Sequence, residues 1–174
     1  MKLLRQITDM DIIGDEKLSK ANPRYTARAI LIDNIGDIAI MYSKKHLLHS
    51  LPGGGIEGNE DKITAAKREI LEETGCNCEI IRDLGYVYEN RAHSDFTQYS
   101  YYYIAKVIGN KGTTNLTENE LNNGTAVEWH DLNTAIRLIS TPTHKTLQQQ
   151  FIQYKDNAAL NELVELVKNK EIIL

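Results

Sequence analysis

Three glutamates stand close together in the stretch LPGGGIEGNEDKITAAKREILEETGC, which runs from Leu51 to Cys76. Glu69, Glu72 and Glu73 follow a run of three glycines and lie in a segment whose periodicity is helical. Like charges three or four residues apart on a helix repel, and each such pair costs about 0.2–0.5 kcal/mol. Clustered carboxylate oxygens are the ligands that hard divalent cations prefer, and Mg2+ is commonly held by one or two carboxylates together with waters and substrate phosphates. The spacing therefore predicts a site for a divalent cation.

A bound cation would also help an acidic protein to hold an anionic substrate. The formal net charge is −4, so the chain offers no broad attraction to phosphates, and nucleic acid is not an expected partner. A cation neutralises a phosphate locally and lowers the pKa of a bound water, which provides a nucleophile at neutral pH. Three glutamates on a helix are also compatible with a plain solvated face. The glycine run ahead of them and Arg68 beside them favour the metal site.

The glutamates need a rigid element, and a helix is expected over residues 62–74, with Gly75 as its C-terminal glycine. At about 100° per residue, one arc forms the core-facing stripe. Its members are Ile63, Ala66, Ile70, Leu71 and Thr74. The three glutamates fall in a second arc that begins beside this stripe, so we expect the carboxylates at the rim of the packed face, partly desolvated.

The other elements are expected to build a layered α+β domain around this helix. Residues suited to strands occupy 25–33, 38–43, 78–89, 97–109 and 125–132. The polar, turn-rich segment 110–124 predicts a loop, and residues 133–139 and about 144–170 predict helices. No repeat or linker is visible, so residues 1–174 are expected to form a single domain.

Composition argues against several other classes of protein. Apolar residues make up 41% and charged residues 25%, which is ordinary for a soluble globular protein. No apolar run approaches the roughly 20 residues that span a bilayer, and the N-terminus lacks a signal-peptide pattern. A cytoplasmic location without a membrane partner is expected by default. Cys76 and Cys78 lack the spacing of zinc ligands and are expected to be small buried side chains. The five histidines show no metal-binding pattern either: His46, His49, His93, His130 and His144.

Residues 54–76 resemble the Nudix box. The motif is a glycine, five residues, a glutamate, seven residues, and then Arg-Glu-apolar-any-Glu-Glu-any-Gly-apolar. Its positions are filled here by Gly54, Glu60, Arg68, Glu69, Ile70, Glu72, Glu73, Gly75 and Cys76. Cys76 is the one soft match, and Asn59 stands where many members have glycine. Outside the box the resemblance is looser and rests on the order of strands and on EWHDL followed by a helix.

The resemblance implies an α/β/α sandwich with a mixed sheet, a loop–helix–loop formed by the box, and C-terminal helices. It implies Mg2+ or Mn2+ as the cofactor, with Glu69, Glu72 and Glu73 as metal ligands. Arg68 would orient these carboxylates. Glu60 would assist the site or its loop, or would simply be a first-turn glutamate favoured by the helix dipole.

Residues on the substrate side are less well marked. Gly54 and Gly55 are expected to approach the substrate, and a backbone carbonyl near Gly54 could reach the metal. Arg28 and Arg91 are candidates to bind phosphate, although either could be a surface arginine. Members of the family often use a further glutamate outside the box as base or ligand. Here Glu118 and Glu120 are the candidates, with Glu120 favoured, and a solvated loop acid is the alternative for each. The aromatic candidates to stack on a base are Tyr88, Phe96, Tyr101, Tyr102 and Tyr103.

The function that the resemblance implies is metal-dependent hydrolysis of a pyrophosphate bond in a nucleoside diphosphate derivative, for example in house-cleaning of modified nucleotides. An ADP-ribose or sugar-nucleotide pyrophosphatase is the alternative, although the downstream proline of many ADP-ribose hydrolases is absent around residues 91–93. A nucleotide-sensing module without turnover is the alternative from another class. Dimerisation is common in the family, and either the aromatic strand or the N-terminal segment could provide the edge of a homodimer.

Overall fold

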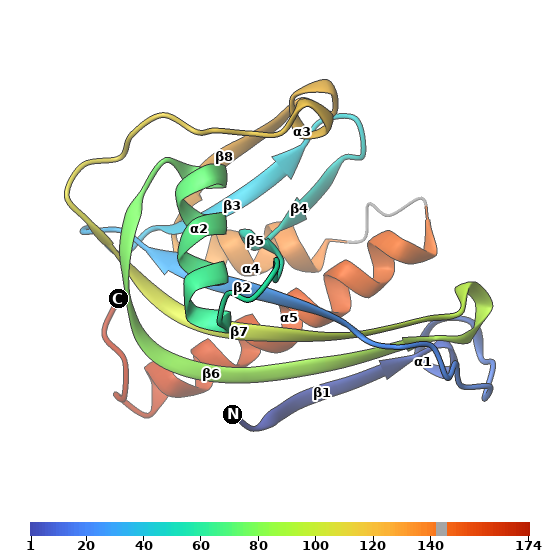
Figure 1. The fold of residues 1–174 in the computed structure, drawn as a ribbon. Coiled ribbons are helices and arrows are strands. Elements are labelled where there is room, and N and C mark those ends of the chain that lie inside the picture. Colours follow the sequence, from blue (N-terminus) through green and yellow to red (C-terminus); the bar gives the residue numbers. More distant parts are fainter. Residues whose placement is uncertain (142–145) are drawn as a thin grey trace.

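The computed structural model describes residues 1–141 and 146–174 (Figure 1). The strands are β1 (Leu3–Thr8), β2 (Arg24–Ile32), β3 (Ile38–Ser43), β4 (Leu48–Ser50), β5 (Gly53–Gly55), β6 (Asn77–Arg91), β7 (Phe96–Ile108) and β8 (Thr125–His130). The helices are α1 (Asp9–Ile13), α2 (Lys62–Thr74), the short 3-10 helix η1 (Ala92–Ser94), α3 (Glu118–Asn122), α4 (Leu132–Ser140) and α5 (Leu147–Lys168). In this part of the chain, no helix is both long enough and apolar enough to cross a membrane.

One mixed sheet organises the molecule. Its order is β1-β6-β7-β2-β3-β4, with β5 paired to β2 and β8 paired to β3. The β1–β6 and β2–β7 pairs are parallel, and the other pairs are antiparallel. Helix α2 covers one face, and α4 and α5 cover the other (Figure 1). The expected α/β/α sandwich with a mixed sheet is confirmed.

The alternation of side chains along β2 divides the two cores. Ala27, Ala29 and Leu31 pack with Ala65, Ala66 and Ile70 of α2 in one apolar cluster. Ile30 and Ile32 point to the opposite face and pack with Phe151 and Leu160 of α5. Because successive residues of a strand face opposite sides, Arg28 lies on the α5 side.

Three features of the chain differ from the expectation. Residues 3–8 form β1, which pairs with β6, and α1 follows it. The segment 110–124 is not all loop, because α3 forms within it. The aromatic strand β7 lies between β6 and β2, so it cannot provide the edge of a homodimer. The first residues of the helix expected from about 144, including His144, lie outside the described residues.

Helix α2 is rotated relative to the expected stripe. Ile63 and Leu71 are 43% and 45% exposed, whereas Ala65 is buried. The buried arc therefore runs from Ala65 through Ala66 and Ile70 to Thr74, and at about 100° per residue Glu69 and Glu73 fall inside it rather than at its rim. The physical reason is the facing strand β5, whose glycines leave room for two carboxylates where apolar side chains would otherwise pack.

A buried carboxylate ties α5 to the chain just before β5. Asp156 is fully buried and accepts a hydrogen bond from the Tyr102 hydroxyl at 2.6 Å and another from the Leu51 amide at 2.9 Å. Leu51 precedes Pro52 and Gly53, so this contact helps to fix the position of the glycine strand. Buried polar groups are costly unless they are hydrogen-bonded, which makes the contact specific to one arrangement.

Removing the hydroxyl of Tyr102 tests this connection. Tyr102→Phe leaves the Asp156 carboxylate buried with one donor fewer, and we expect the free energy of unfolding to fall by about 1–3 kcal/mol. Urea unfolding followed by circular dichroism measures the change. Tyr25→Phe is the matched control because Tyr25 is 45% exposed, and its effect should stay within about 0.5 kcal/mol. Equal effects of the two substitutions would contradict the proposed role of the contact.

Candidate active site

The glycines of β5 allow the carboxylates of α2 to approach the sheet. The amide of Gly53 donates a hydrogen bond to Oε2 of Glu73 at 2.6 Å. A Cβ atom on Gly54 would lie 2.4 Å from Oε1 of Glu69, so only glycine leaves room for this side chain where it stands. Pairing of β5 with β2, between Gly53 and Arg28 among others, holds the glycines in register. The structure thus brings Glu69 and Glu73 together with the box glycines.

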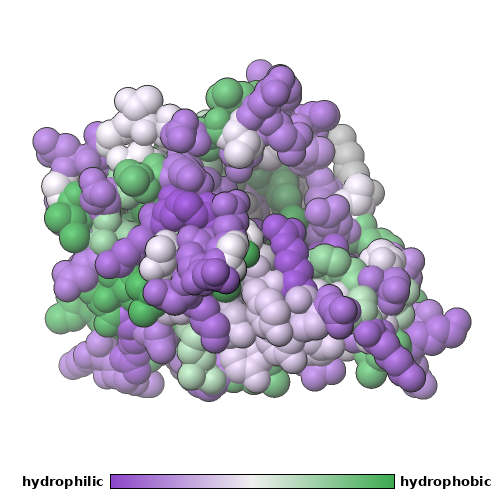
Figure 2. Space-filling model, in the orientation of Figure 1, coloured by the Kyte–Doolittle hydropathy of each residue, from purple (hydrophilic) through white to green (hydrophobic). Residues whose placement is uncertain are grey.

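Arg68 connects the remaining acidic residues of the box. Its guanidinium donates to Glu60 at 2.8 Å, to Glu69 at 2.9 Å and to Glu72 at 3.1 Å. It also donates to the carbonyl oxygen of Gly55 at 2.9 Å. A planar guanidinium with five donors is suited to this fan of acceptors. Figure 2 shows hydrophilic residues gathered over α2, where this network lies.

Glu60 supports Arg68 and does not belong to the first turn of the helix. Asp61 is the N-cap of α2 and accepts from the amides of Ile63 and Thr64. Glu60 precedes this cap, and its carboxylate accepts from the amide of Glu57 and from Arg68. The hydrogen bonds from Arg68 are the main reason that the pKa of Glu60 lies below its ordinary value. The dipole interpretation of Glu60 is therefore wrong.

The surroundings of two box glutamates favour the protonated, neutral form of the carboxyl group. Burial raises the pKa of Glu73 to about 8. The negative charges of Glu69 and Glu120 raise it further, whereas the charge of Arg28 and the hydrogen bond from the Gly53 amide lower it. Burial also raises the pKa of Glu69, although Arg68 opposes this shift. Ionised together, these carboxylates need a further positive charge beside them.

The donors of the box fit a hard divalent cation. Glu69, Glu72 and Glu73 offer carboxylate oxygens from one rigid helix, and burial without enough positive charge raises the pKa of two of them. Within residues 1–141 and 146–174, no three His, Cys, Asp or Glu side chains already stand together as a complete set of metal ligands. Glu69 and Glu72 are instead paired with Arg68. Binding of a cation would therefore replace some of these contacts.

The two candidates outside the box lie on α3. The carboxylate of Glu120 accepts from the amide and the hydroxyl of Thr117, both at 2.7 Å, and so closes the cap of this short helix. Glu120 nevertheless lies near enough to Glu73 to raise its pKa. Glu118 occupies the first turn of the same helix. Of these two residues, Glu120 is the one whose charge acts on Glu73.

A cationic pocket borders the box glycines on the α5 side of the sheet. Its volume is about 340 Å³, and it contains both arginines that the sequence suggested for phosphate. The lining includes Arg24, Arg28, Gly54, Arg91, Phe96 and Lys155. Arg24 and Lys155 were not expected. The sequence does contain a signal for Arg24: it lies two residues before Thr26 and four before Arg28, so the three side chains share one face of the strand. No local pattern marks Lys155.

The floor of this cationic pocket is a buried ion-pair network. Glu89 is fully buried between Arg91, with which it forms a close ion pair, and Lys155, whose Nζ lies 3.1 Å from it. Burial lowers the pKa of Lys155 to about 8, against the charge of Glu89. The Nε atoms of Arg28 and Arg91 are buried and have no hydrogen-bond partner within the described part of the chain. Such donors favour an anionic ligand in the pocket.

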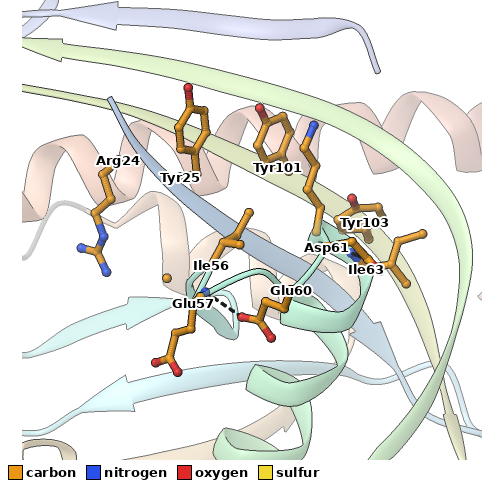
Figure 3. A pocket seen from close by; sticks show the side chains of 12 residues that line it. Arg24, Tyr25, Ile56, Glu57, Glu60, Asp61, Ile63, Tyr101 and Tyr103 are labelled. Carbon is orange, nitrogen blue, oxygen red and sulfur yellow. Dashed lines mark hydrogen bonds between the residues drawn. The ribbon is translucent and has the colours of Figure 1, made fainter. Parts of the chain in front are cut away.

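A second, larger pocket lies on the α2 side of the sheet. Its volume is about 1190 Å³, and its walls combine the box loop with aromatic side chains (Figure 3). Tyr101 and Tyr103 line it together with Tyr25, whereas Tyr102 is in the opposite core. Of the aromatic residues expected to stack on a base, Phe96 thus lines the cationic pocket, and Tyr101 and Tyr103 line the larger one.

Among residues 1–141 and 146–174, the cysteines and histidines form no cluster that could hold a metal ion. Cys76 and Cys78 are buried and free, as expected. His93 pairs with Asp9 at 2.7 Å, and His49 and His130 lie 3.8 Å and 3.1 Å from Glu128.

Comparison with known proteins agrees with the geometry. The model of the NUDIX domain matches residues 22–153. A NUDIX hydrolase from Nitrosomonas europaea is similar in structure, with 17% identity, a TM-score of 0.62, and coverage of 83% of this chain and 90% of that one. A MutT NUDIX hydrolase from Burkholderia pseudomallei has 21% identity and a TM-score of 0.55, with coverage of 77% and 98%. An ADP-ribose pyrophosphatase from Streptococcus suis has 16% identity and a TM-score of 0.51, with coverage of 80% and 91%.

The raised pKa of Glu73 predicts a pH-dependent stability. The folded protein holds this proton up to a pKa of about 8, above the ordinary value of 4.5. Protonation of Glu73 therefore contributes to the free energy of unfolding in full below about pH 4.5, and this contribution is lost as the pH rises through about 8. In the presence of a chelator, Glu73→Gln should therefore be more stable than the parent protein at about pH 9, by on the order of 2 kcal/mol.

Urea unfolding at about pH 4.5, 7 and 9 measures this difference. Glu165→Gln is the control, because this glutamate is 61% exposed and pairs only with Lys168 in the described structure. A difference between Glu73→Gln and the parent protein that stays constant with pH would contradict the assignment.

Proposed function

Because the chain belongs to the NUDIX hydrolase family, we propose that it hydrolyses the pyrophosphate bond of a nucleotide-type substrate with Mg2+ or Mn2+ as cofactor. The observation that supports this proposal most directly is the position of the glycine strand β5. On one side it contacts the carboxylates of Glu69 and Glu73, and on the other it borders the cationic pocket. Groups that hold a cation and groups that hold phosphates thus meet at Gly54.

Glu69, Glu72 and Glu73 would hold the metal ion. When bound, the ion supplies positive charge to the phosphates and a water of lowered pKa. Arg68 would orient Glu69 and Glu72 through those of its present hydrogen bonds that the cation does not replace, and Glu60 would keep Arg68 in place. Arg68 and Glu60 are therefore positioning residues. Glu120 would add negative charge beside Glu73 and strengthen the attraction for the cation.

The cationic pocket would hold the phosphate groups and keep them beside the box. Arg28 and Arg91 would donate their unpartnered Nε hydrogens, and Lys155 and Arg24 would add charge at the wall. Gly54 and Gly55 let the substrate approach the backbone without meeting a side chain. Positioning and charge neutralisation of this kind account for most of the catalysis of phosphoryl transfer.

The identity of the group attached to the diphosphate is the finer part of the proposal. A modified nucleotide is one candidate, and ADP-ribose or a sugar nucleotide is the other, since one of the structural relatives is an ADP-ribose pyrophosphatase. A sensing module without turnover is less consistent with the chain, because all box carboxylates are present.

A substrate panel tests the proposed function. Purified protein is incubated with nucleoside triphosphates, modified nucleotides, ADP-ribose and sugar nucleotides, each with Mg2+, with Mn2+ or with a chelator, and released phosphate or nucleoside monophosphate is measured. We expect hydrolysis of at least one class, dependent on the divalent cation. Cleavage that is unaffected by the chelator would contradict the role of the metal, and no cleavage of any compound would favour the sensing module.

Glu73→Gln is expected to lower kcat on the best substrate by at least about 100-fold, because it removes a charge that the cation needs. The Gln oxygen can still accept from the Gly53 amide, so the fold should persist, as circular dichroism would show. Glu165→Gln, far from the box on α5, should retain full turnover. Undiminished turnover by Glu73→Gln would remove this residue from the metal site.

A further inference from the structure

A buried carboxylate near the N-terminus holds the turn between β6 and β7. Asp9, the first residue of α1, is fully buried, and its side chain accepts two hydrogen bonds from His93 in η1. The amide nitrogen of His93 lies 2.7 Å from Oδ2, and the ring Nδ1 lies 2.7 Å from Oδ1. An ionised carboxylate can only accept, so Nδ1 is the donor in the second contact. One buried side chain therefore fixes both the backbone and the ring of His93.

Ser19 ties the segment after α1 to the same turn. Its amide donates to Oδ1 of Asn90 at 2.8 Å, and the Asn90 side chain donates back to the carbonyl oxygen of Ser19 at 3.0 Å. The Ser19 hydroxyl donates to Asp95 at 2.7 Å. Figure 1 shows the loop after α1 and the turn between β6 and β7 together at one end of the sheet. Asp9 and Ser19 form what we call the N-terminal clamp.

The turn that the N-terminal clamp holds supplies Arg91, Ser94 and Phe96 to the lining of the cationic pocket. The Arg91 guanidinium packs over the Phe96 ring, with Cζ 4.8 Å from the ring centre, and pairs with the buried Glu89. Arg91 lies only two residues before His93 in the chain. A shift of the turn would therefore move this guanidinium relative to the rest of the pocket.

The ring of Phe151 connects His93 with Arg91 in space. This ring is fully buried, and its centre lies 6.2 Å from the centre of the His93 ring. Cζ of Arg91 lies 4.6 Å from the centre of the same Phe151 ring. The imidazole that Asp9 holds and the guanidinium of the pocket thus pack on one side chain of α5.

We propose that His93 is a positioning residue for Arg91, and that its contact with Asp9 sets the affinity of the cationic pocket for phosphate groups. The turn keeps one position because displacement of His93 would leave the buried carboxylate without its donors, which is costly. Arg91 then presents its guanidinium at a fixed place, and a misplacement of about 1 Å can cost about 100-fold in rate. This inference rests on the proposed function for the class of ligand and goes beyond it by naming what holds the arginine.

Anion binding without turnover tests the N-terminal clamp. Isothermal titration calorimetry in a chelator measures the affinity of the full chain for inorganic pyrophosphate. We expect His93→Leu to weaken binding at least about fivefold, because the turn loses a contact to Asp9. His93→Asn should weaken binding less than His93→Leu, since the amide nitrogen of Asn can take the place of Nδ1. Asp131→Ala is the control, because it removes the N-cap of α4 and leaves the turn untouched, and it should bind like the parent protein.

A double-mutant cycle distinguishes positioning of Arg91 from a general loss of structure. Arg91→Gln alone should weaken pyrophosphate binding at least about tenfold, because a charged donor is lost. In the Arg91→Gln background, His93→Leu should change the affinity by less than about twofold, since its effect passes through the missing guanidinium. Ser19→Ala is a milder second variant that keeps the contact between Asp9 and His93. It should weaken binding about two- to threefold, and only while Arg91 is present.

The outcomes separate this inference from the hydrolase function. Parent-like binding by both His93→Leu and Ser19→Ala, equal losses with and without Arg91, or no binding of pyrophosphate by the parent protein would each overturn the inference. If the substrate panel shows no hydrolysis while the clamp variants weaken pyrophosphate binding as expected, the hydrolase function fails and the role of His93 stands. If the panel shows hydrolysis while the clamp variants bind like the parent protein, the role of His93 fails and the hydrolase function stands.

Discussion

The close approach between α2 and the glycine strand β5 is the constraint on which the site depends. Because Gly53 and Gly54 have no Cβ atoms, two glutamates can enter the packed face of a helix and meet backbone instead of apolar side chains. Burial raises the pKa of both carboxylates, so their ionisation is unfavourable unless a cation binds beside them. The same absence of side chains opens the strand to the cationic pocket on its other side. Affinity for a cation and access for a phosphate therefore have one structural origin.

The sequence predicted the parts of the molecule whose signals are local. Alternating strand residues, the period of α2 and the glycine at its end were sufficient for most elements and for the sandwich. The orientation of α2 was misjudged because periodicity alone ranks Ile63 and Leu71 as core, whereas the facing glycines admit Glu69 and Glu73 instead. The strand β1 was missed because its pairing with β6 depends on residues far along the chain.

The cationic pocket shows why half of the site could not be predicted. Its charged residues come from β2, β6 and α5, and each alone looks like an ordinary surface residue in the sequence. A buried charge outside this pocket, Asp156, did leave a trace in the sequence, since it lies four and seven residues before Leu160 and Leu163 and hence in the apolar stripe of α5. A charge in such a register indicates a buried partner, which here is Tyr102 together with the Leu51 amide.

The two parallel pairings have a consequence for biosynthesis. Leu3 is the register partner of Tyr86, and Tyr25 that of Tyr99. The parallel partners of β1 and β2 therefore follow them by more than seventy residues in the sequence. A nascent chain leaving the ribosome cannot close its sheet until β6 and β7 have emerged, and long-range closure of this kind is slow. During that interval the apolar edge of β2 is available to the wrong partners, which is the period when a chaperone would be of most use.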